Sequence, residues 1–381
     1  MLPDFIQTAS REAGFHRCGI ASLAQPMPEL DFFPAWLDSG AAGEMRYLAS
    51  RDEQGRLKRA SVQQTFPWAK SAIVCALDYN TAQPYSTECR VTEGGKGDPK
   101  RGWISRYAWF PNTDYHHAIM SRLERVEAAV TAAYPPAVHA EVRTRRYVDT
   151  GPLLERVLAK YAGLGWMAKN TCIINEELGS WLFLGVALTS LELATTAELP
   201  APDRCGTCTA CLDACPTQAF PAPYQLDASR CISYLTIEKR GAIPEDLRSG
   251  IGNNLFGCDI CQDVCPWNSA HHREKQLGKK SSHRETPEHL PVPEFVPDEA
   301  LVNPPLAWLA EMSLADFQKQ FRHSPIKRAK HSGLRRNAIV AIGNSGDRNF
   351  VPLLERLAHD DDPIVAGHAQ WSLEKLSRLP T

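Results

Sequence analysis

The sequence predicts an α+β protein of several domains, and three observations lead to that class. The chain has 381 residues, more than the roughly 250–300 at which a single hydrophobic core stops growing. Strand and helix patterns alternate over residues 1–200, as in an α/β domain. Eight of the twelve cysteines lie between residues 205 and 265, and the last eighty residues have helical patterns. We expect four parts, an α/β domain (1–200), a cysteine-organised domain (201–270), a connector (271–304) and a helical module (305–381).

The overall composition is that of an ordinary globular protein. The hydrophobic share is 43%, the charged share is 23% and the formal net charge is −2, values that exclude a disordered, collagen-like or coiled-coil chain. The balanced charge also argues against histone-like binding to nucleic acid, although a local basic patch is compatible with it. No segment reaches the roughly 18 apolar residues that a membrane span needs, and no signal-peptide run opens the chain. We expect a cytoplasmic protein that does not bind membranes.

Periodicity and composition place the elements of the N-terminal domain. The stretch SAIVCALDY over 71–79 is continuously apolar and rich in β-formers, which is typical of a buried strand. In chain order we expect a helix over 3–13, strands over 18–22 and 71–79, a long helix over 115–133, a strand over 142–149, a Thr-Gly-Pro turn with a helix through 162, and a strand over 181–190.

The C-terminal part has the order of helices and turns that is typical of a HEAT-type repeat. Helices are expected over 334–343, 349–359 and 364–376, with an acidic turn ending in Pro363 before the last one. Only about one and a half such repeats fit, which predicts a small helical module and not a solenoid. The connector before it is polar, basic and proline-rich.

The cysteine spacing carries the clearest chemistry. Residues 205–216 read C-x2-C-x2-C-x3-C-P, a spacing that wraps one 4Fe–4S cluster with three thiolates and sends the fourth to a neighbouring cluster. A second copy over 258–266 lacks its first cysteine, because Leu255 stands there, and Cys231 can replace it. One cluster would then take Cys205, Cys208, Cys211 and Cys265, and the other Cys215, Cys231, Cys258 and Cys261.

Two structural zinc sites are the alternative, because they also use CxxC pairs. Zinc needs neither the dense triple of cysteines nor the Cys-Pro arm, so we favour two iron–sulfur clusters in a ferredoxin-like domain. Two adjacent clusters conduct single electrons, which predicts a redox protein. We interpret Cys18, Cys75, Cys89 and Cys172 as ordinary thiols.

The catalytic centre is expected in the 200 residues before the clusters. No G-x-G-x-x-G motif follows a strand and no Walker motif occurs. Asp149 ends an apolar strand before a turn and a helix, where α/β proteins commonly place ligands. A helix-capping aspartate is the simpler interpretation of that position, and a proton donor there would need burial to raise its pKa.

Several stretches resemble one family, the epoxyqueuosine reductases, along nearly the whole chain. The reductive dehalogenases share the general plan and match less well. The matching stretches are YVDTGPLLER over 147–156, AGLGWMAKNT over 162–171, RCISYLTIE over 230–238, GAIPE over 241–245, GCDICQDVCPWN over 257–268, ISRYAW over 104–109 and LRRNAIVAIGN over 334–344.

The resemblance implies a cobalamin in the N-terminal domain, beside one of the clusters. It implies reduction of the epoxide at the tRNA wobble nucleoside to an alkene, with two electrons passing through the clusters to cobalt. Asp149 matches the family's proton donor, Arg59 a cobalamin contact, and Ser233 a residue lining the corrin site. Two departures are the longer stretch over 109–114, which puts the corrin contacts there in doubt, and Ala168 in place of a common glycine.

A basic run lies at the start of the C-terminal helices. Residues 319–336 contain seven Lys and Arg and no Asp or Glu, which makes a local field suited to phosphates. A solvated basic face is the alternative for such a run taken alone. Given the substrate that the resemblance implies, we expect tRNA contacts from Lys327, Arg328, Arg335 and Arg336, and anticodon-loop contacts from Lys239 and Arg240.

The leading hypothesis is an oxidoreductase that uses cobalamin and two 4Fe–4S clusters to act on tRNA. One alternative is a cobalamin and iron–sulfur reductase of another substrate, as in reductive dehalogenases. Others are an electron-transfer protein and a non-catalytic RNA-binding protein with a redox-sensing cluster. We expect a monomer that receives electrons from an external donor, whose identity the sequence does not indicate.

Overall fold

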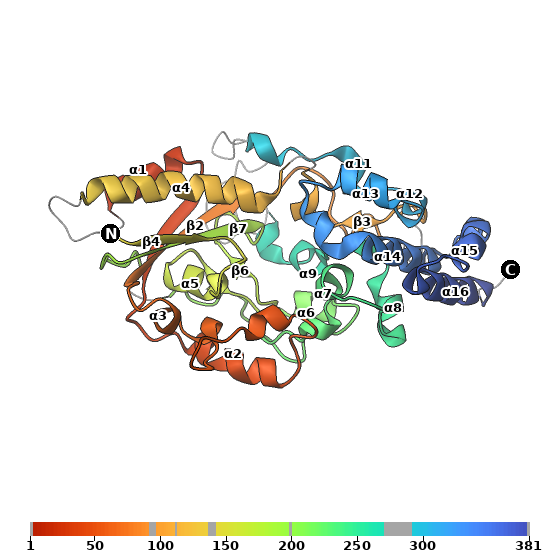
Figure 1. The fold of residues 1–381 in the computed structure, drawn as a ribbon, viewed down its shortest axis with the longest axis horizontal. Helices are drawn as coiled ribbons and strands as arrows, with labels where there is room; N and C mark the ends of the chain where they lie inside the picture. The colour runs from red at the N-terminus through yellow and green to blue at the C-terminus, as the bar shows by residue number, and fades with distance from the viewer. Residues whose placement is uncertain are drawn as a thin grey trace.

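The computed structural model describes residues 3–90, 97–110, 113–135, 142–197, 200–269 and 292–378. Figure 1 shows a sheet with its helices at the N-terminal end, short helices in the middle and a group of helices at the C-terminal end. Residues 271–291 of the predicted connector lie outside the described residues.

A four-stranded sheet forms the N-terminal part. Its strands are β1 (Arg17–Ser22), β2 (Ser71–Asp78), β7 (Leu182–Thr189) and β4 (Thr144–Tyr147), which lie side by side in that order. The central strand β2 is buried at every residue except its last, because helices cover both faces of the sheet. This double burial explains why its sequence is continuously apolar and does not alternate.

The strand directions correct the α/β prediction for this domain. All three neighbouring pairs are antiparallel, whereas α/β domains have parallel strands. The segment between β1 and β2 contains α2 (Pro28–Asp38) and α3 (Val62–Thr65). Long helical connections can join neighbouring strands of either direction, so alternating periodicity does not reveal strand direction. The α+β class predicted for the whole chain agrees with this mixture.

Helices pack on both faces of the sheet. On one face lie α1 (Asp4–Glu12) and α4 (Tyr115–Ala133), which contact each other. On the other face α5 (Glu155–Tyr161) contacts β1, β2 and β7. Each layer has its own hydrophobic cluster, and Figure 1 shows α5 on the opposite face of the sheet from α4.

Short elements hold the cysteine segment together. It contains α6 (Ala210–Asp213), α7 (Ile232–Ile237), α8 (Glu245–Ile251) and α9 (Ile260–Asp263). Before it, β5 (Trp166–Met167) and β6 (Ile173–Ile174) form an antiparallel pair. The loop of this pair, residues 168–172, lies between the N-terminal domain and both cysteine motifs.

Helices make up the described C-terminal part. They are α11 (Glu299–Val302), α12 (Leu306–Ala310), α13 (Leu314–Gln320), α14 (Lys330–Ser345), α15 (Val351–Leu357) and α16 (Pro363–Ser377). The helix α14 contacts both α12 and α16.

The C-terminal core crosses the domain boundary that we predicted at residue 200. The strand β3 (Trp103–Ile104) pairs in parallel with β8 (Asn254–Phe256). Trp103 and Trp109 belong to the same hydrophobic cluster as Leu334 and other C-terminal residues. The segment around 103–109 therefore packs with the C-terminal helices, although it precedes the clusters in sequence. In the described ranges no helix has both the length and the apolar character that crossing a membrane would require.

Candidate functional site

The two cysteine motifs adopt the same local form. In each, a loop is followed by one short helix, α6 after Cys208 and α9 after Cys258, and these two helices contact each other. Because each motif ends in Cys-Pro directly after its helix, the last thiol of one motif is carried toward the thiols of the other.

The thiols fall into two electrostatic groups. Burial and then the neighbouring Cys205 raise the pKa of Cys211 to about 11, and burial raises the pKa of Cys265 to about 12, with Cys205 and Cys211 adding to the effect. Cys258 interacts in the same way with Cys231 and Cys215, and Cys261 with Cys258 and Cys231. These interactions follow the two predicted ligand sets, but Cys172 also interacts with Cys261 and Cys265, and the assignment of ligands stays a prediction.

The loop over 168–172 connects the two cysteine groups. The buried Lys169 donates hydrogen bonds to the carbonyls of Gly206 and Cys208, at 2.6 and 2.9 Å. Asn170 Nδ2 donates to the carbonyl of Cys261 at 3.2 Å. Cys172, which we interpreted as an ordinary thiol, hydrogen-bonds the side chain of Cys261. The single loop therefore positions parts of both groups.

Among the described residues, no three Cys, His, Asp or Glu side chains converge as the ligands of one metal ion do. The four thiolates on the corners of a cubane cluster stand further apart than four ligands around a single ion. Two groups of thiols that hold cubane clusters are therefore not expected to converge as the ligands of a single ion do.

A large cavity opens between the N-terminal domain and the cysteine segment. Its volume is about 1690 Å³. Its wall includes residues of α2, the segment 47–66, the turn after β4, α5 and the end of α7, among them Tyr47, Arg59, Tyr115, Asp149, Glu155 and Arg328. Drug-sized ligands occupy pockets of roughly 300–1,000 Å³, so this cavity suits a larger ligand.

Asp149 lies on the cavity wall in an unusual backbone conformation. It is exposed, two residues beyond the end of β4, and its φ is 52°, a left-handed value that few residues other than glycine adopt. The phenol of Tyr115 donates a hydrogen bond to its carboxylate. The strand predicted to run through Asp149 therefore ends earlier, and a turn presents the carboxyl group to the cavity. Backbone strain of this kind is common at functional sites.

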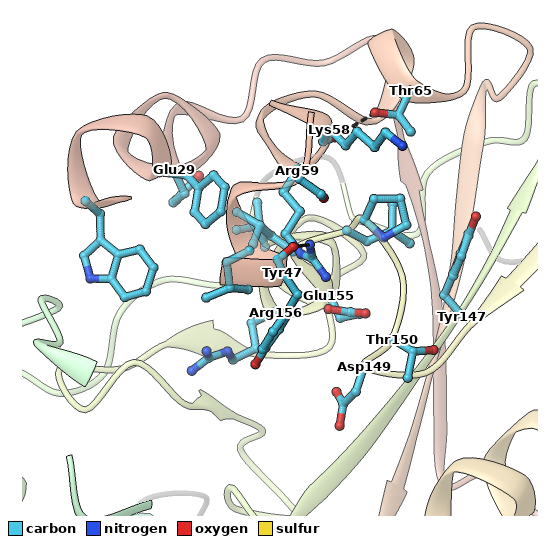
Figure 2. Close-up of a pocket in the computed structure, with 18 of the residues that line it drawn as sticks. Glu29, Tyr47, Lys58, Arg59, Thr65, Tyr147, Asp149, Thr150, Glu155 and Arg156 are labelled. Atoms are coloured by element: carbon cyan, nitrogen blue, oxygen red, sulfur yellow. Dashed lines mark hydrogen bonds between the residues drawn. The ribbon is translucent and has the colours of Figure 1, made fainter. Parts of the chain in front are cut away.

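Arg59 supports this turn from a short 3-10 helix, Lys58–Ala60. It is 7% exposed and donates to the carbonyls of Gly151, at 2.7 Å, and Tyr47, at 2.8 Å. The guanidinium group thereby links the turn after β4 to the segment that carries Tyr47, and Figure 2 shows Arg59 beside Tyr47.

Glu155 is a second carboxyl group on the same wall. It begins α5, and its Oε1 is buried with no hydrogen-bond partner. Burial and then the negative charge of Asp149 raise the pKa of Glu155 to about 7, while Arg59 and Arg156 act in the opposite direction. Sequence reasoning did not single out Glu155, although it lies six residues after Asp149 within the stretch that resembles the family.

Ser233 is not among the residues that line this cavity, and its predicted place beside the corrin stays a prediction. The cavity wall includes Ile237 and Glu238 from the end of α7, whereas Ser233, in the first turn of α7, hydrogen-bonds Cys231. One helix therefore serves two sites, because its first turn faces a thiol and its last turn faces the cavity.

Four of the predicted tRNA contacts line the cavity or lie within two residues of its lining residues Glu238 and Arg328. Arg328 lines the cavity and forms an ion pair with Glu238. Lys239 forms an ion pair with Glu44. Arg240 is exposed and donates to the carbonyl of Ile237 at 2.9 Å, and Lys327 Nζ lies 3.2 Å from the Asp114 carboxylate.

The other two predicted contacts, Arg335 and Arg336, are structural, which corrects our expectation. Arg336 is 1% exposed, and it donates to the carbonyls of Lys239, Gly241 and Leu235 at 2.7–3.0 Å. Arg335 forms an ion pair with Asp360 at 2.6 Å, with its side chain 12% exposed. Both lie on faces of α14 that meet other elements, so neither is available to a phosphate.

Two family models match this chain. The model described as "4Fe-4S double cluster binding domain" matches residues 204–268, and the model described as "Epoxyqueuosine reductase QueG, DUF1730" matches residues 59–150. The first covers all eight predicted cluster ligands. The second contains both Arg59 and Asp149.

Curated proteins and solved structures are similar over almost the full length. The epoxyqueuosine reductase of Xanthomonas campestris pv. campestris is 38% identical, over 97% of this chain and 94% of its own. That of Pseudomonas aeruginosa is 36% identical, over 98% and 94%. A crystal structure of an epoxyqueuosine reductase with an epoxyqueuosine-modified tRNA-Tyr stem loop has a TM-score of 0.78 and 30% identity, and covers 98% of this chain and 89% of that chain.

Proposed function

This chain belongs to the epoxyqueuosine reductase family, and we propose that it reduces epoxyqueuosine to queuosine at the wobble position of tRNA. The observation that carries the proposal is the large cavity with Asp149 on its wall, to which the cysteine segment also contributes residues. It is an arrangement in which electrons can reach a bound ligand while a carboxyl group supplies a proton. The full-length similarity to curated epoxyqueuosine reductases supports this chemistry over that of a dehalogenase or a simple electron carrier.

Two 4Fe–4S clusters would be held by the eight cysteines. We assign Cys205, Cys208, Cys211 and Cys265 to one cluster and Cys215, Cys231, Cys258 and Cys261 to the other. The electrostatic coupling within each group supports this division, as does the double-cluster family model over 204–268. The clusters would pass electrons singly from an external donor.

Cobalamin is the ligand that we assign to the cavity. The volume of about 1690 Å³ exceeds what drug-sized ligands need, and the wall includes polar and charged side chains such as Gln64, Thr150 and Arg156. The residues present therefore fit a large ligand with polar substituents. When bound, a reduced cobalamin supplies the electrons that remove the epoxide oxygen. Arg59 would shape this site by holding the turn that carries Asp149.

Asp149 would donate a proton to the departing oxygen. Its carboxyl group is exposed to the cavity and is oriented by Tyr115, which prevents it from turning away. A relative from Bacillus subtilis with a TM-score of 0.77 and 30% identity is described with its aspartate-bearing catalytic loop swung out of the active site. We propose that the turn after β4 is the corresponding loop and that Arg59 and Tyr115 hold it inward.

The tRNA would approach the cavity mouth from the side of the C-terminal helices. Lys239, Arg240, Lys327 and Arg328 lie there and can contact phosphates of the anticodon loop. A wobble base in a loop can leave its stack and enter the cavity at lower cost than a base in a duplex. We further propose that α14, α15 and α16 form a HEAT-like module that supports this surface, and that the protein acts as a monomer.

An anaerobic single-turnover assay tests the function. Protein reconstituted with iron, sulfide and cobalamin is reduced and mixed with epoxyqueuosine-containing tRNA, and the nucleosides are analysed by mass spectrometry. We expect the nucleoside to lose one oxygen atom, and the rate to fall about 10²- to 10⁴-fold in Asp149→Asn. Asp246→Asn removes an exposed carboxylate on α8 and should keep the wild-type rate. An intact nucleoside after reaction with fully loaded wild-type protein would refute the function.

A further inference from the structure

Removing an epoxide oxygen as water needs more protons than Asp149 alone holds. The reaction breaks two carbon–oxygen bonds, forms the second bond of an alkene, and consumes two electrons and two protons. The electrons come one at a time from an external low-potential donor. A single carboxyl group gives one proton and must then be protonated again before it can give another. The cavity therefore needs a second proton source.

We propose that Glu155 is this second proton source and that it passes its proton to Asp149, a role that rests on the proposed function. In each turnover Asp149 protonates the departing oxygen, and Glu155 protonates the Asp149 carboxylate. Asp149 then supplies the second proton, which completes the water molecule. Glu155 regains its proton from solvent through the open cavity. Glu155 acts through Asp149 and does not need to touch the substrate.

The position of Glu155 supports this role. Both carboxyl groups belong to the cavity wall, and Figure 2 shows them on neighbouring parts of that wall, with Arg59 on the far side of Glu155. The two residues come from the turn after β4 and from the start of α5, so one short segment fixes both. Glu155 Oε1 is buried and has no hydrogen-bond partner, which leaves it available for proton transfer.

Burial and the charges around Glu155 set its pKa close to neutral pH. Asp149 on the turn disfavours a second negative charge, while Arg59 on the 3-10 helix and Arg156 on α5 favour it. Burial outweighs the two cations, and the resulting pKa of about 7 is close to neutral pH. A proton donor transfers its proton most efficiently when its pKa lies near the working pH.

The test compares wild-type protein, Glu155→Gln and Glu155→Asp in the single-turnover assay, from about pH 5.5 to about pH 9. We expect the wild-type rate to fall as the pH rises through about 7. Glu155→Gln should be about 10- to 100-fold slower at the acidic end and should lack this decline. Glu155→Asp should retain the decline, at an intermediate rate. Glu12→Gln, on α1 across the sheet, should behave as wild type.

A second measurement does not depend on turnover. Burial raises the pKa of Asp263 to about 7 as well, so its infrared band is common to wild type and Glu155→Gln. Difference spectra of the reconstituted wild-type protein should contain an additional protonated-carboxyl band that titrates near pH 7 and is missing from Glu155→Gln. The absence of such a band from the wild-type protein would overturn the proposal. A Glu155→Gln variant with the wild-type rate and pH profile would also overturn it, even if the band is present. Wild-type protein that leaves the nucleoside intact refutes the proposed function instead, and the two failures are therefore distinguishable.

Discussion

The phenol of Tyr115 donates a hydrogen bond to the carboxylate of Asp149. Tyr115 begins α4 on one face of the sheet, while Asp149 lies on the turn after β4. The Tyr115 ring is itself fixed by stacking on Phe183, with ring centroids 4.5 Å apart and an interplanar angle of 1°. Burial and then the Asp149 charge raise the pKa of Tyr115 well above its usual value, so the phenol remains a hydrogen-bond donor at neutral pH.

Tyr115→Phe should slow the reaction without unfolding the protein. The phenyl ring keeps the stacking on Phe183, but the Asp149 side chain loses the group that orients it. We expect a single-turnover rate about 10- to 100-fold lower and a loss of unfolding free energy of about 0.5–1.5 kcal/mol, measured by urea denaturation. Tyr134→Phe, at the other end of α4, is the matched control. A wild-type rate in Tyr115→Phe would show that the phenol does not position Asp149.

Arg59→Lys should loosen the turn that carries Asp149. A lysine keeps the charge, but its ammonium group cannot span the carbonyls of Gly151 and Tyr47 as the planar guanidinium does. We expect cobalamin affinity, measured by visible absorption titration, to fall about tenfold, and the unfolding free energy to fall by about 1–3 kcal/mol. Arg51→Lys, on the exposed part of the same segment, should change neither quantity. Unchanged cobalamin binding in Arg59→Lys would contradict the role of Arg59 in that site.

Arg328 and Arg336 should respond differently to substitution, although both belong to the basic run. Arg328→Ala removes a cation from the cavity wall, so we expect weaker tRNA binding. The slope of the logarithm of the binding constant against the logarithm of the salt concentration should fall by about the value of one phosphate contact. Arg336→Met leaves three backbone carbonyls without their donor and should lower the unfolding free energy by about 2–4 kcal/mol. Binding titrations at several salt concentrations and urea denaturation measure the two effects. A folded Arg336→Met variant with a loss of tRNA affinity equal to that of Arg328→Ala would contradict this division.

Local patterns were sufficient to predict the four strands of the main sheet and the long helices α4, α14 and α16. The expected helix over 115–133 coincides with α4, and the expected strand over 71–79 differs from β2 by one residue. Helix capping, apolar periodicity and cysteine spacing are properties of neighbouring residues, so one sequence contains them. The strand expected to reach Asp149 ends at Tyr147. The sequence did not indicate this end, because the residue with positive φ in the following turn is Asp149 and not a glycine.

Contacts between distant segments were the part that the sequence did not reveal. Arg336 belongs to a run of cations that resembles a phosphate-binding surface, yet its side chain is buried because α14 meets carbonyls within and after α7. The motif around Ser233 did not indicate which residues of α7 face Cys231 and which face the cavity, because the rotation of the helix decides this. Antiparallel pairing in the sheet also depends on how long connections return, which periodicity does not encode.

The burial of His368 predicts that the folded protein loses stability in mild acid. It is 1% exposed on α16, where its Nε2 accepts a hydrogen bond from the Ile243 amide at 3.2 Å. Burial lowers the pKa of His368 to about 4, so between about pH 6.5 and pH 4 the unfolded chain binds the proton that the folded protein excludes. Stability is therefore fully present above that window and decreases as the pH falls through it.

Urea denaturation at several pH values tests the role of His368. We expect the wild-type unfolding free energy to fall by about 1–3 kcal/mol more than that of His368→Gln between pH 7 and pH 5. His359→Gln, at the end of the preceding helix, replaces a histidine whose side chain is not fully buried and should keep the wild-type dependence. Parallel pH curves for wild type and His368→Gln would show that another group causes any acid sensitivity.

Substitutions of Cys231 and Cys172 distinguish a predicted cluster ligand from a thiol that only lies beside one. Both interact with Cys261, but only Cys231 completes a set of four under our assignment. We expect Cys231→Ser to lose one cluster, so that iron and sulfide content after anaerobic reconstitution fall by about half. Cys172→Ser should retain both clusters, because serine can keep the side-chain hydrogen bond to Cys261. The reverse result, with iron lost from Cys172→Ser and retained in Cys231→Ser, would exchange the two residues in the second ligand set.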